Sequence, residues 1–437
     1  MSTRPRPGPD PVPDPVHLDP LTRFLFVPRT VTFLVLGLLL LTYYSHALDV
    51  TLTSTSTLSN TKNGIYAVVC VFLGYSAVQG RGSSHLTRPH PSFWKLVHGV
   101  MVCYLLFMVF LLFQTVGDAR QFLKHLYPEL GVELEERAYG ASCALLVDDD
   151  DGSPTGTRMN WGAIKATLFD EFVVAHTLGW WGKALILRDT SMLWVVSVAF
   201  ELMELTFQHL LPNFNECWWD SWILDVAVCN AIGIYTGMWT VRYFNGKEYD
   251  WAGMGMSAQP TLLAKATRSV LQFTPARYDV FEWGLGTWFR SPKRFLQCFF
   301  PAVIILLFEV NHFFLKYELW VPPRNPLNTI RLTVLFLIAV PGIREYYEYI
   351  ELNDARTPFT RLGVYAWTGV AIAFVEMLMI VKFGRGMFDA PWPTRVLVAW
   401  GSVFVLFAIV MPVWVWRSGW EGGGKKWRNR RRQTTAA

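Results

Sequence analysis

The chain has 437 residues, of which 52% are hydrophobic, 15% aromatic and only 17% charged. Soluble globular proteins carry about 25% charged residues, so the composition excludes an ordinary soluble domain, and the aromatic content excludes a disordered or fibrous chain. Six cysteines are too few for a disulfide scaffold. A net charge of +5 is too small to indicate a nucleic-acid partner. These properties favour an all-α, polytopic integral membrane protein.

The N-terminal residues 1–25 are rich in proline and aspartate and lack both apolar periodicity and a signal peptide, which predicts a disordered cytosolic tail. After this tail, apolar runs recur along the chain. Since a membrane-spanning helix needs about 20 apolar residues, we expect about ten transmembrane helices in one multi-span domain, residues 26–417. The expected helices are Val31–Tyr44, Gly64–Val78, Leu96–Val116, Phe172–Leu187, Ser191–Phe207, Trp219–Met238, Leu296–Leu315, Ile330–Ile343, Leu362–Ile380 and Leu397–Trp416.

The distribution of basic residues predicts the orientation. An even number of spans places both ends of the chain on one side, and the basic tail 418–437 indicates that this side is the cytosol. The segment 208–218 between the fifth and sixth runs has no Lys or Arg and is therefore expected on the opposite side. We assign the stretch before the fourth run, with its acidic residues 148–151, to that side as well. The cysteines inside apolar runs are expected to be small buried hydrophobic residues, namely Cys70, Cys103, Cys229 and Cys298.

Ionisable side chains are costly inside a membrane, so their positions in apolar runs indicate function. They concentrate between residues 170 and 230, in the fourth to sixth runs. Helical spacing places Glu201 and Glu204 on one face of the fifth helix. The same spacing places His176 and Lys183, seven residues apart, on one face of the fourth.

The direction of these helices brings the polar groups to one level. Glu216 and Asp220 are four residues apart at the start of the sixth run, whereas Asp225, five residues beyond Asp220, is expected to point partly elsewhere. In the topology above, the fourth helix begins, the fifth ends and the sixth begins on the non-cytosolic side. We therefore expect the polar ends of three helices to meet near that membrane face.

Five neighbouring carboxylates require either protonation or bound cations. A set of ligands that contains only oxygen suits a hard divalent ion such as Ca²⁺ or Mg²⁺, and Ca²⁺ is the available choice on a lumenal side. His176 is the candidate base, because the unperturbed pKa of histidine suits proton transfer near neutral pH. The candidate metal ligands are Glu201, Glu204, Asn213, Glu216, Asp220 and Asp225.

Simpler interpretations stay open for several of these residues. His176 alone could be a hydrogen-bond partner between helices, and the acids could line the ion path of a transporter or lipid scramblase. We expect Lys183 and Arg188 to extend toward the cytosolic interface, and Trp180 to lie at an interface. For a second polar set, packing hydrogen bonds are as good an interpretation as function; its members are Glu309, Asn311, His312 and Glu376.

The stretch from Phe169 to Asn230 closely resembles the eukaryotic base-exchange phosphatidylserine synthases. The string from Leu211 to Asp220, LPNFNECWWD, is long and rich in rare residues. Weaker matches extend the resemblance over residues of about 85 to 385, with Asn215 as a departure where relatives often have a small residue. The other motifs that carry the resemblance are Phe169–His176, Glu201–Glu204, Ile223–Asp225, Thr87–Pro91, Leu271–Pro275, Glu309–Asn311 and Arg344–Glu345.

The resemblance implies a calcium-dependent transferase of the endoplasmic reticulum membrane, with a catalytic core at about 169–230 near the lumenal face. Its expected substrates are L-serine and a membrane phospholipid, phosphatidylethanolamine or phosphatidylcholine, whose head group serine replaces. The family's catalytic histidine corresponds to His176, and its calcium-binding motifs correspond to the acids and Asn213 named above. Arg88 and Lys183 are candidate substrate-binding residues. A homodimer is an open alternative for the assembly.

The expected mechanism is an exchange without ATP. His176 removes the proton of the serine hydroxyl, which attacks phosphorus, and the old head group leaves; a covalent phosphatidyl-histidine stays open as an alternative. The stretch Glu309–Pro323 resembles the ethanolamine-preferring branch of the family, which implies ethanolamine rather than choline as the leaving group. A CDP-alcohol phosphotransferase is disfavoured, because its DGxxAR signature is absent from the sequence.

Overall fold

The computed structural model describes residues 30–49, 56–78, 91–133, 171–245, 288–352 and 362–420, together with residues 143, 146–148, 157–159, 161 and 165. Arg88, the N-terminal tail and most of the C-terminal tail lie outside the described residues. The elements in chain order are α2 (Thr30–Tyr44), α3 (Thr57–Val78), α4 (Pro91–Leu112), α5 (Val116–Leu126), β1 (Leu146–Asp148), β2 (Thr157–Met159), α7 (Glu171–Leu187), α8 (Thr190–Phe207), η2 (Pro212–Phe214), η3 (Asp220–Asn230), α9 (Ala231–Asn245), α12 (Pro292–Glu318), α13 (Pro326–Leu352), α14 (Val364–Phe383), α15 (Arg385–Phe388) and α16 (Thr394–Ser418).

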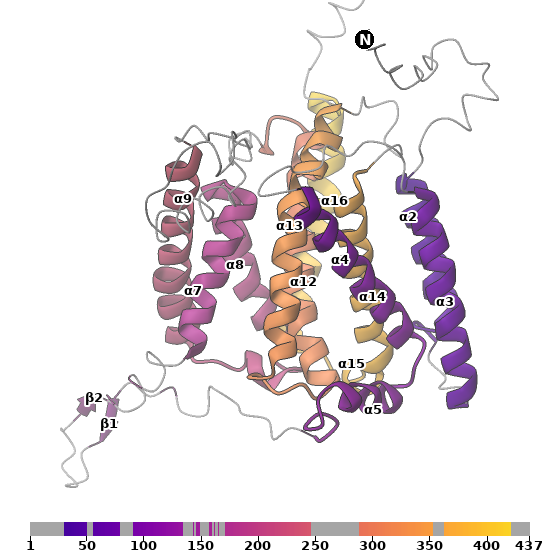
Figure 1. The fold of residues 1–437 in the computed structure, drawn as a ribbon. Coiled ribbons are helices and arrows are strands. Elements are labelled where there is room, and N and C mark those ends of the chain that lie inside the picture. The colour runs from indigo at the N-terminus through magenta and orange to yellow at the C-terminus, as the bar shows by residue number, and fades with distance from the viewer. Residues whose placement is uncertain are drawn as a thin grey trace, which may run out of the picture.

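Helices lie where the apolar runs predict them, and they form one bundle (Figure 1). Within the described ranges, six helices are long and apolar enough to cross a membrane, counting η3 and α9 as one. Helix α2 and the segment Leu96–Leu112 are apolar but shorter. An integral membrane protein is therefore confirmed, whereas the number of ten spans stays a prediction. The small antiparallel hairpin β1–β2 is a departure from a purely helical fold.

Local chemistry sets several helix starts. Asp189 accepts a hydrogen bond from the backbone N–H of Met192 at 2.8 Å and so caps α8. Ser291 caps α12 in the same way, with Pro292 in the first helical position, where its missing N–H costs nothing. The turn between α7 and α8 is therefore short and fixed, which makes these two helices antiparallel neighbours.

Helix α14 forms the centre of one half of the bundle. It packs against α2, α4, α12 and α13, and two thirds of its most apolar segment is buried. A polar cluster joins these helices: Arg331 donates two hydrogen bonds to the carboxylate of Glu376, at 2.9 and 2.7 Å. The hydroxyl of Tyr104 and the amide of Asn311 also donate to Glu376, at 2.5 and 3.3 Å. Asn311 and Glu376 of the second polar set are thus packing residues.

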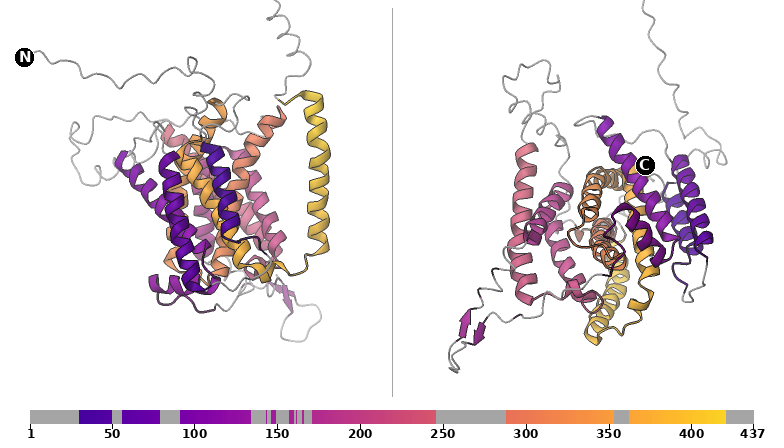
Figure 2. Two further views of the ribbon diagram at one scale, coloured as in Figure 1. Left: turned by 90° about the vertical axis from the view of Figure 1, so that its right-hand side faces the viewer. Right: turned by 60° about the horizontal axis from the view of Figure 1, so that its bottom comes forward.

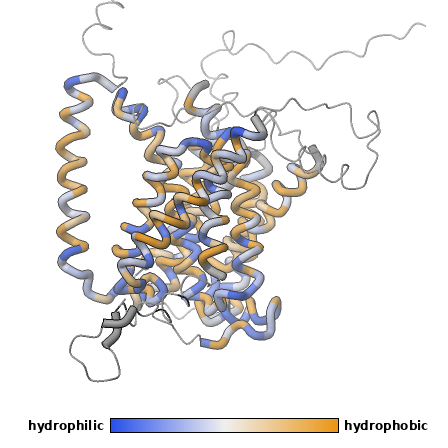
Figure 3. The backbone as a smooth tube through the Cα atoms, turned by 90° about the vertical axis from the view of Figure 1, so that its left-hand side faces the viewer, coloured by the Kyte–Doolittle hydropathy of each residue, from blue (hydrophilic) through white to orange (hydrophobic). Residues whose placement is uncertain are grey.

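The other half of the bundle consists of α7, α8, η3 and α9, which lie side by side in Figures 1 and 2. Helix α16 stands apart from the bundle (Figure 2), and its most apolar stretch is wholly exposed in the isolated chain. Figure 3 shows hydrophobic residues along α16 and hydrophilic residues at its ends, the pattern of a helix surrounded by lipid.

The path of the chain agrees with the expected orientation. Helix α2 begins and α16 ends on the same face of the bundle, whereas α5 and the β1–β2 hairpin lie on the opposite face (Figure 1). Helix α8 ends, and η3 begins, on this second face, where the 208–219 loop connects them. This arrangement places the predicted polar groups of three helices near one membrane face.

Candidate active site

An unusual helix aligns the acids of the sixth run. Residues 220–230 form a π-helix, in which each backbone N–H bonds five residues back, so side chains five apart share a face. Asp220, Asp225 and Asn230 therefore follow one another along a row that turns gradually around the helix. The expectation that Asp225 points partly elsewhere than Asp220 assumed the four-residue bonding of an α-helix, and the π-helix turns Asp225 closer to the side of Asp220. Turns of π-helix are rare and occur frequently at functional sites.

His176 lies at the centre of the polar contacts between α7 and η3. Its Nε2 is 2.6 Å from Asn230 Oδ1 and 3.9 Å from Asp225 Oδ1. The Asn230 amide nitrogen donates to Ser197 Oγ of α8 at 2.8 Å, and both residues are fully buried. The indole N–H of Trp180 also points at His176 Nε2, at 3.1 Å. Three helices therefore fix this imidazole.

The two close contacts of His176 suit different protonation states. A neutral Nε2 with a lone pair accepts the hydrogen bond from Trp180, whereas a protonated Nε2 donates to Asn230 Oδ1. Asp225 is near enough to stabilise the positive charge of the protonated ring. The surroundings thus accommodate Nε2 both with and without a hydrogen atom.

Buried acids lie next to this histidine. Glu201 is 2% exposed, and no N–H or O–H group of the described residues donates to its carboxylate oxygens, whose nearest polar neighbour is the carboxyl group of Glu204. Glu204, also buried, lies within electrostatic reach of Glu201, Glu216 and Asp225. In the loop that leads to η3, burial raises the pKa of the Glu216 carboxyl to about 8, and the charges of Asp225, Asp220 and Glu201 add to this rise.

The chemistry of these acids suits a hard cation. A bound cation would give the carboxylate oxygens of Glu201 a partner and would reduce the repulsion between the neighbouring carboxylates. Asn213 lies half-buried in the short turn η2, in the loop that also contains Glu216. No three His, Cys, Asp or Glu side chains in the described part of the chain are close enough together to form a ready metal site. The carboxylates would therefore have to move together around an ion.

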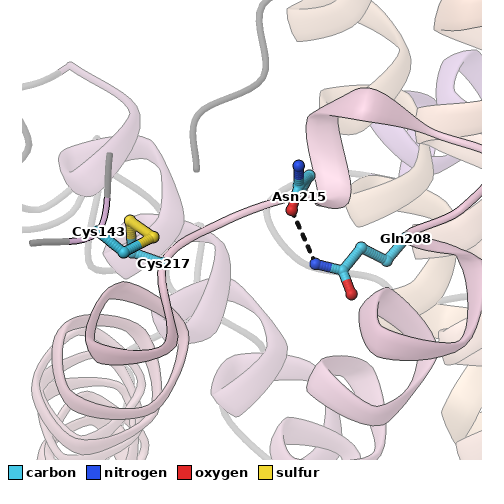
Figure 4. The surroundings of a disulfide bond; sticks show 4 residues. All are labelled: Cys143, Gln208, Asn215 and Cys217. Atoms are coloured by element: carbon cyan, nitrogen blue, oxygen red, sulfur yellow. Dashed lines mark hydrogen bonds between the residues drawn. A yellow bond between two sulfur atoms is a disulfide. The ribbon is translucent and has the colours of Figure 1, made fainter. Parts of the chain in front are cut away.

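A disulfide bond stabilises the loop next to the acids. Cys143 and Cys217 are bonded across 74 residues of sequence, and Cys217 directly follows Glu216 (Figure 4). In the same loop, the Gln208 amide donates to the Asn215 side chain at 2.8 Å. This pairing was not predicted, since disulfide connectivity depends on the fold. Of the cysteines expected to be buried, Cys229 and Cys298 are, whereas Cys70 and Cys103 are exposed on the outside of the bundle.

Two glycines of α9 hold this helix close to α7. A Cβ atom at Gly233 would lie 2.6 Å from both the Thr177 carbonyl oxygen and the Trp180 side chain, and a Cβ at Gly237 only 2.5 Å from Ala184. The Gly-xxx-Gly spacing is typical of membrane helices whose backbones touch. Since α9 continues η3 directly, this contact also sets the distance between Asn230 and His176.

Lys183 does not extend freely toward the cytosolic interface, because its ammonium group is paired inside the bundle. Lys183 Nζ lies 3.2 Å from Glu309 of α12 and 4.0 Å from the centre of the Trp180 ring. Helical side chains tilt toward the N-terminus of their helix, and α7 runs away from the acids, so Lys183 points back toward His176. Arg188 is buried at the end of α7. Trp180, expected at an interface, is 1% exposed.

The structure thus brings most of the predicted site residues together. His176 and the acids Glu201, Glu204, Glu216, Asp220 and Asp225 share one region, with Lys183 within electrostatic reach of Glu201. Ser197 and Asn230 were not predicted as site residues, and for Glu309 both packing and function were left open. The five-residue spacing of Asp220, Asp225 and Asn230 was visible, but it indicates a shared face only once a π-helix is assumed.

The comparisons with known proteins show which family the chain belongs to. The family described as "Phosphatidyl serine synthase" matches residues 89–384. The chain is 49% identical over 401 residues to "CDP-diacylglycerol--serine O-phosphatidyltransferase 2" of Oryza sativa subsp. japonica, covering 92% of this chain and 91% of the relative. It is 40% identical over 356 residues to "Phosphatidylserine synthase 2" of Homo sapiens, covering 81% and 70%.

Membership of an enzyme family decides against the transporter and scramblase alternatives. The matched region contains every described site residue discussed above. The chain therefore belongs to the phosphatidylserine synthase family, and it is a multi-pass membrane phosphatidyltransferase.

Proposed function

We propose that this protein makes phosphatidylserine by exchanging the ethanolamine head group of phosphatidylethanolamine, or less readily the choline of phosphatidylcholine, for L-serine. The observation that supports this proposal most is the position of His176. It lies beside Asp225 and Asn230, at the level where the unpartnered carboxylate of Glu201 is buried. A proton acceptor next to a cation-binding group of acids suits attack of a hydroxyl on a phosphodiester.

In this mechanism His176 is the general base. Its nitrogen removes the proton of the serine hydroxyl, the serine oxygen bonds to phosphorus, and the bond from phosphorus to the ethanolamine oxygen breaks. The protonated imidazole, held by Asn230 and Asp225, then returns the proton to the departing oxygen. One bond of the same type is formed and one is broken, so the exchange needs no ATP.

The acids and Asn213 would hold calcium. A bound Ca²⁺ would offset the negative charge that builds up on the phosphodiester in the transition state. The proposed ligands are Glu201, Glu204, Asn213, Glu216, Asp220 and Asp225. Arg88 is proposed to contact the lipid phosphate.

We also propose that the site opens near the lumenal face of the endoplasmic reticulum membrane. Disulfides persist in oxidising compartments, and the Cys143–Cys217 bond lies on the face opposite the start of α2 and the end of α16. The calcium of a secretory lumen would be accessible from this side.

CDP-diacylglycerol is a second candidate donor. The relatives from Oryza sativa and Arabidopsis thaliana, 49% and 45% identical to this chain, are named CDP-diacylglycerol--serine O-phosphatidyltransferases after this donor. With this donor, serine would displace CMP instead of ethanolamine. The absence of the DGxxAR signature from the sequence supports phospholipid exchange as the main proposal.

One assay separates these proposals. Purified protein receives labelled serine and Ca²⁺ with phosphatidylethanolamine, phosphatidylcholine or CDP-diacylglycerol as the only donor, and labelled lipid and the released group are measured. We expect labelled lipid and free ethanolamine. Label only with CDP-diacylglycerol would overturn the exchange proposal, and no label with any donor would overturn serine transfer itself.

Variants test the assigned roles in the same assay. His176→Ala should abolish turnover, whereas His125→Ala, on the exposed helix α5, should not change it. Glu204→Gln should raise the Ca²⁺ concentration needed for half-maximal activity, and an unchanged calcium dependence would remove this ligand. Parallel initial-rate lines with varied serine and phospholipid would support a phosphatidyl-histidine and contradict direct displacement.

A further inference from the structure

The ion pair between Lys183 and Glu309 lies near His176, the proposed catalytic base. Lys183 of α7 and Glu309 of α12 are 3.2 Å apart between one nitrogen and one oxygen. The two side chains remain 15% and 26% exposed. No side-chain hydrogen bond of Lys183 or Glu309 is found among the described residues, so the ammonium group and the carboxylate keep hydrogen-bonding capacity for a ligand.

Another ion pair among the described helices has a different geometry. Arg331 and Glu376 are joined by two hydrogen bonds, and the side chain of Glu376 has no exposed surface. Tyr104 and Asn311 bond to the same carboxylate. A pair with this geometry holds helices together. The Lys183–Glu309 pair has one contact and is open to small molecules, which a purely structural role does not require.

The pair lies within reach of a serine molecule bound at His176. Lys183 lies over the Trp180 ring, 4.0 Å from its centre, and Trp180 donates to His176 Nε2 at 3.1 Å. These contacts limit the distance from Lys183 Nζ to His176 Nε2 to at most about 10 Å. A serine molecule with a hydrogen bond of about 3 Å at its hydroxyl and another at its carboxylate can span up to about 10 Å, so one serine can contact both residues. Lys183 and Glu309 both lie within electrostatic reach of His176.

We propose that Lys183 and Glu309 bind the carboxylate and the ammonium group of free serine and thereby position its hydroxyl at His176. This inference rests on the proposed function and assigns the residues that recognise the acceptor. Serine and ethanolamine both have an ammonium group, and only serine has a carboxylate. Lys183, which binds the carboxylate, therefore distinguishes the incoming serine from the leaving ethanolamine. When no serine is bound, the two side chains neutralise each other.

The test compares L-serine with serinol, in which a hydroxymethyl group replaces the carboxylate. Removal of both charges, in the double variant Lys183→Met/Glu309→Gln, avoids an unpaired buried charge. We expect kcat/KM for serine to fall about 10- to 100-fold, mainly through a higher KM, because charged hydrogen bonds to substrate are lost. Serinol should lose less than about threefold, since it has no carboxylate to lose a contact.

A charge-swapped variant, Lys183→Glu/Glu309→Lys, covers the case in which the neutral variant does not fold. It keeps an ion pair between α7 and α12, so a structural role predicts normal discrimination between serine and serinol. Our proposal predicts that discrimination is lost. The matched control is Arg331→Met/Glu376→Gln, which removes the buried pair and should lower the yield of folded protein without changing the ratio of serine to serinol use.

The outcomes separate this inference from the proposed function. If the wild-type protein transfers serine and both variants keep its preference over serinol, the acceptor role of Lys183 and Glu309 is wrong and the proposed reaction stands. Equal losses for both acceptors in both variants would also overturn the inference, because they would indicate a structural role. A wild-type protein that transfers no serine with any donor would defeat the proposed function itself.

Discussion

The hydrogen bond between Ser197 and Asn230 offers a sharp test of how His176 is positioned. Ser197 Oγ accepts from the Asn230 amide at 2.8 Å, and both residues are fully buried. In Ser197→Ala this amide N–H loses its partner, and the orientation that turns Oδ1 toward His176 is no longer fixed. A lost buried hydrogen bond costs about 1 to 3 kcal/mol.

In the proposed transition state the imidazole is protonated and is stabilised by Asn230. If the loss of the hydrogen bond raises the free energy of this transition state by about 1.4 kcal/mol, kcat falls about 10-fold. The KM for serine should stay within about twofold, because Ser197 contacts no substrate. The assay is the formation of labelled phosphatidylserine by purified protein at saturating Ca²⁺. Ser402→Ala on α16, where the hydroxyl bonds only to the Val398 carbonyl, is the matched control. Unchanged kcat in Ser197→Ala, or an equal loss in the control, would refute the positioning role.

Three further predictions concern the framework of the site. Gly233→Ala should push α9 away from α7, destabilise the protein by about 1 to 3 kcal/mol and strongly lower turnover, whereas Gly401→Ala, with open space around it, should do neither in the same melting and activity assays. Cys217→Ser removes the disulfide and should cost about 2 to 4 kcal/mol in detergent unfolding; dithiothreitol should impair the wild type and not this variant, and equal sensitivity would contradict the prediction. Arg331→Met leaves Glu376 buried without its cation and should cost about 3 to 5 kcal/mol; adding Glu376→Met should recover much of this loss, and simple addition of the two single losses would argue against the pairing.

Local sequence properties were sufficient to predict the helices. The apolar run Ser191–Phe207 corresponds to the helix Thr190–Phe207, and the run Val31–Tyr44 to Thr30–Tyr44. Length and hydrophobicity of a run are properties of the segment itself, so no knowledge of its neighbours is needed. The β1–β2 hairpin and the disulfide depend on contacts between distant segments and were not predictable in this way.

The site was predictable in composition but not in arrangement. The sequence indicates that His176 and several acids meet near one face, since this follows from the helix order. Hydropathy does not distinguish hydrogen bonding four residues back from bonding five back, so the row of Asp220, Asp225 and Asn230 stayed hidden. The pairing of Lys183 with Glu309 could not be predicted for a second reason. Glu309 lies 126 positions further along the chain, and only the arrangement of α7 and α12 in the bundle brings the two side chains together.

The two polar sets of this bundle show that the number of buried charges is a weaker guide to function than their hydrogen bonding. Both oxygens of Glu376 are bonded, to Arg331, Tyr104 and Asn311, and this set joins helices. Both oxygens of Glu201 lack partners among the described residues, although Glu201 is equally deep. An unbonded buried carboxylate is unfavourable unless another group, such as a cation, completes it. The fold holds this unfavourable arrangement in place through the π-helix and the close contact of α9 with α7, which is the expected property of a site built for a ligand that is not part of the chain.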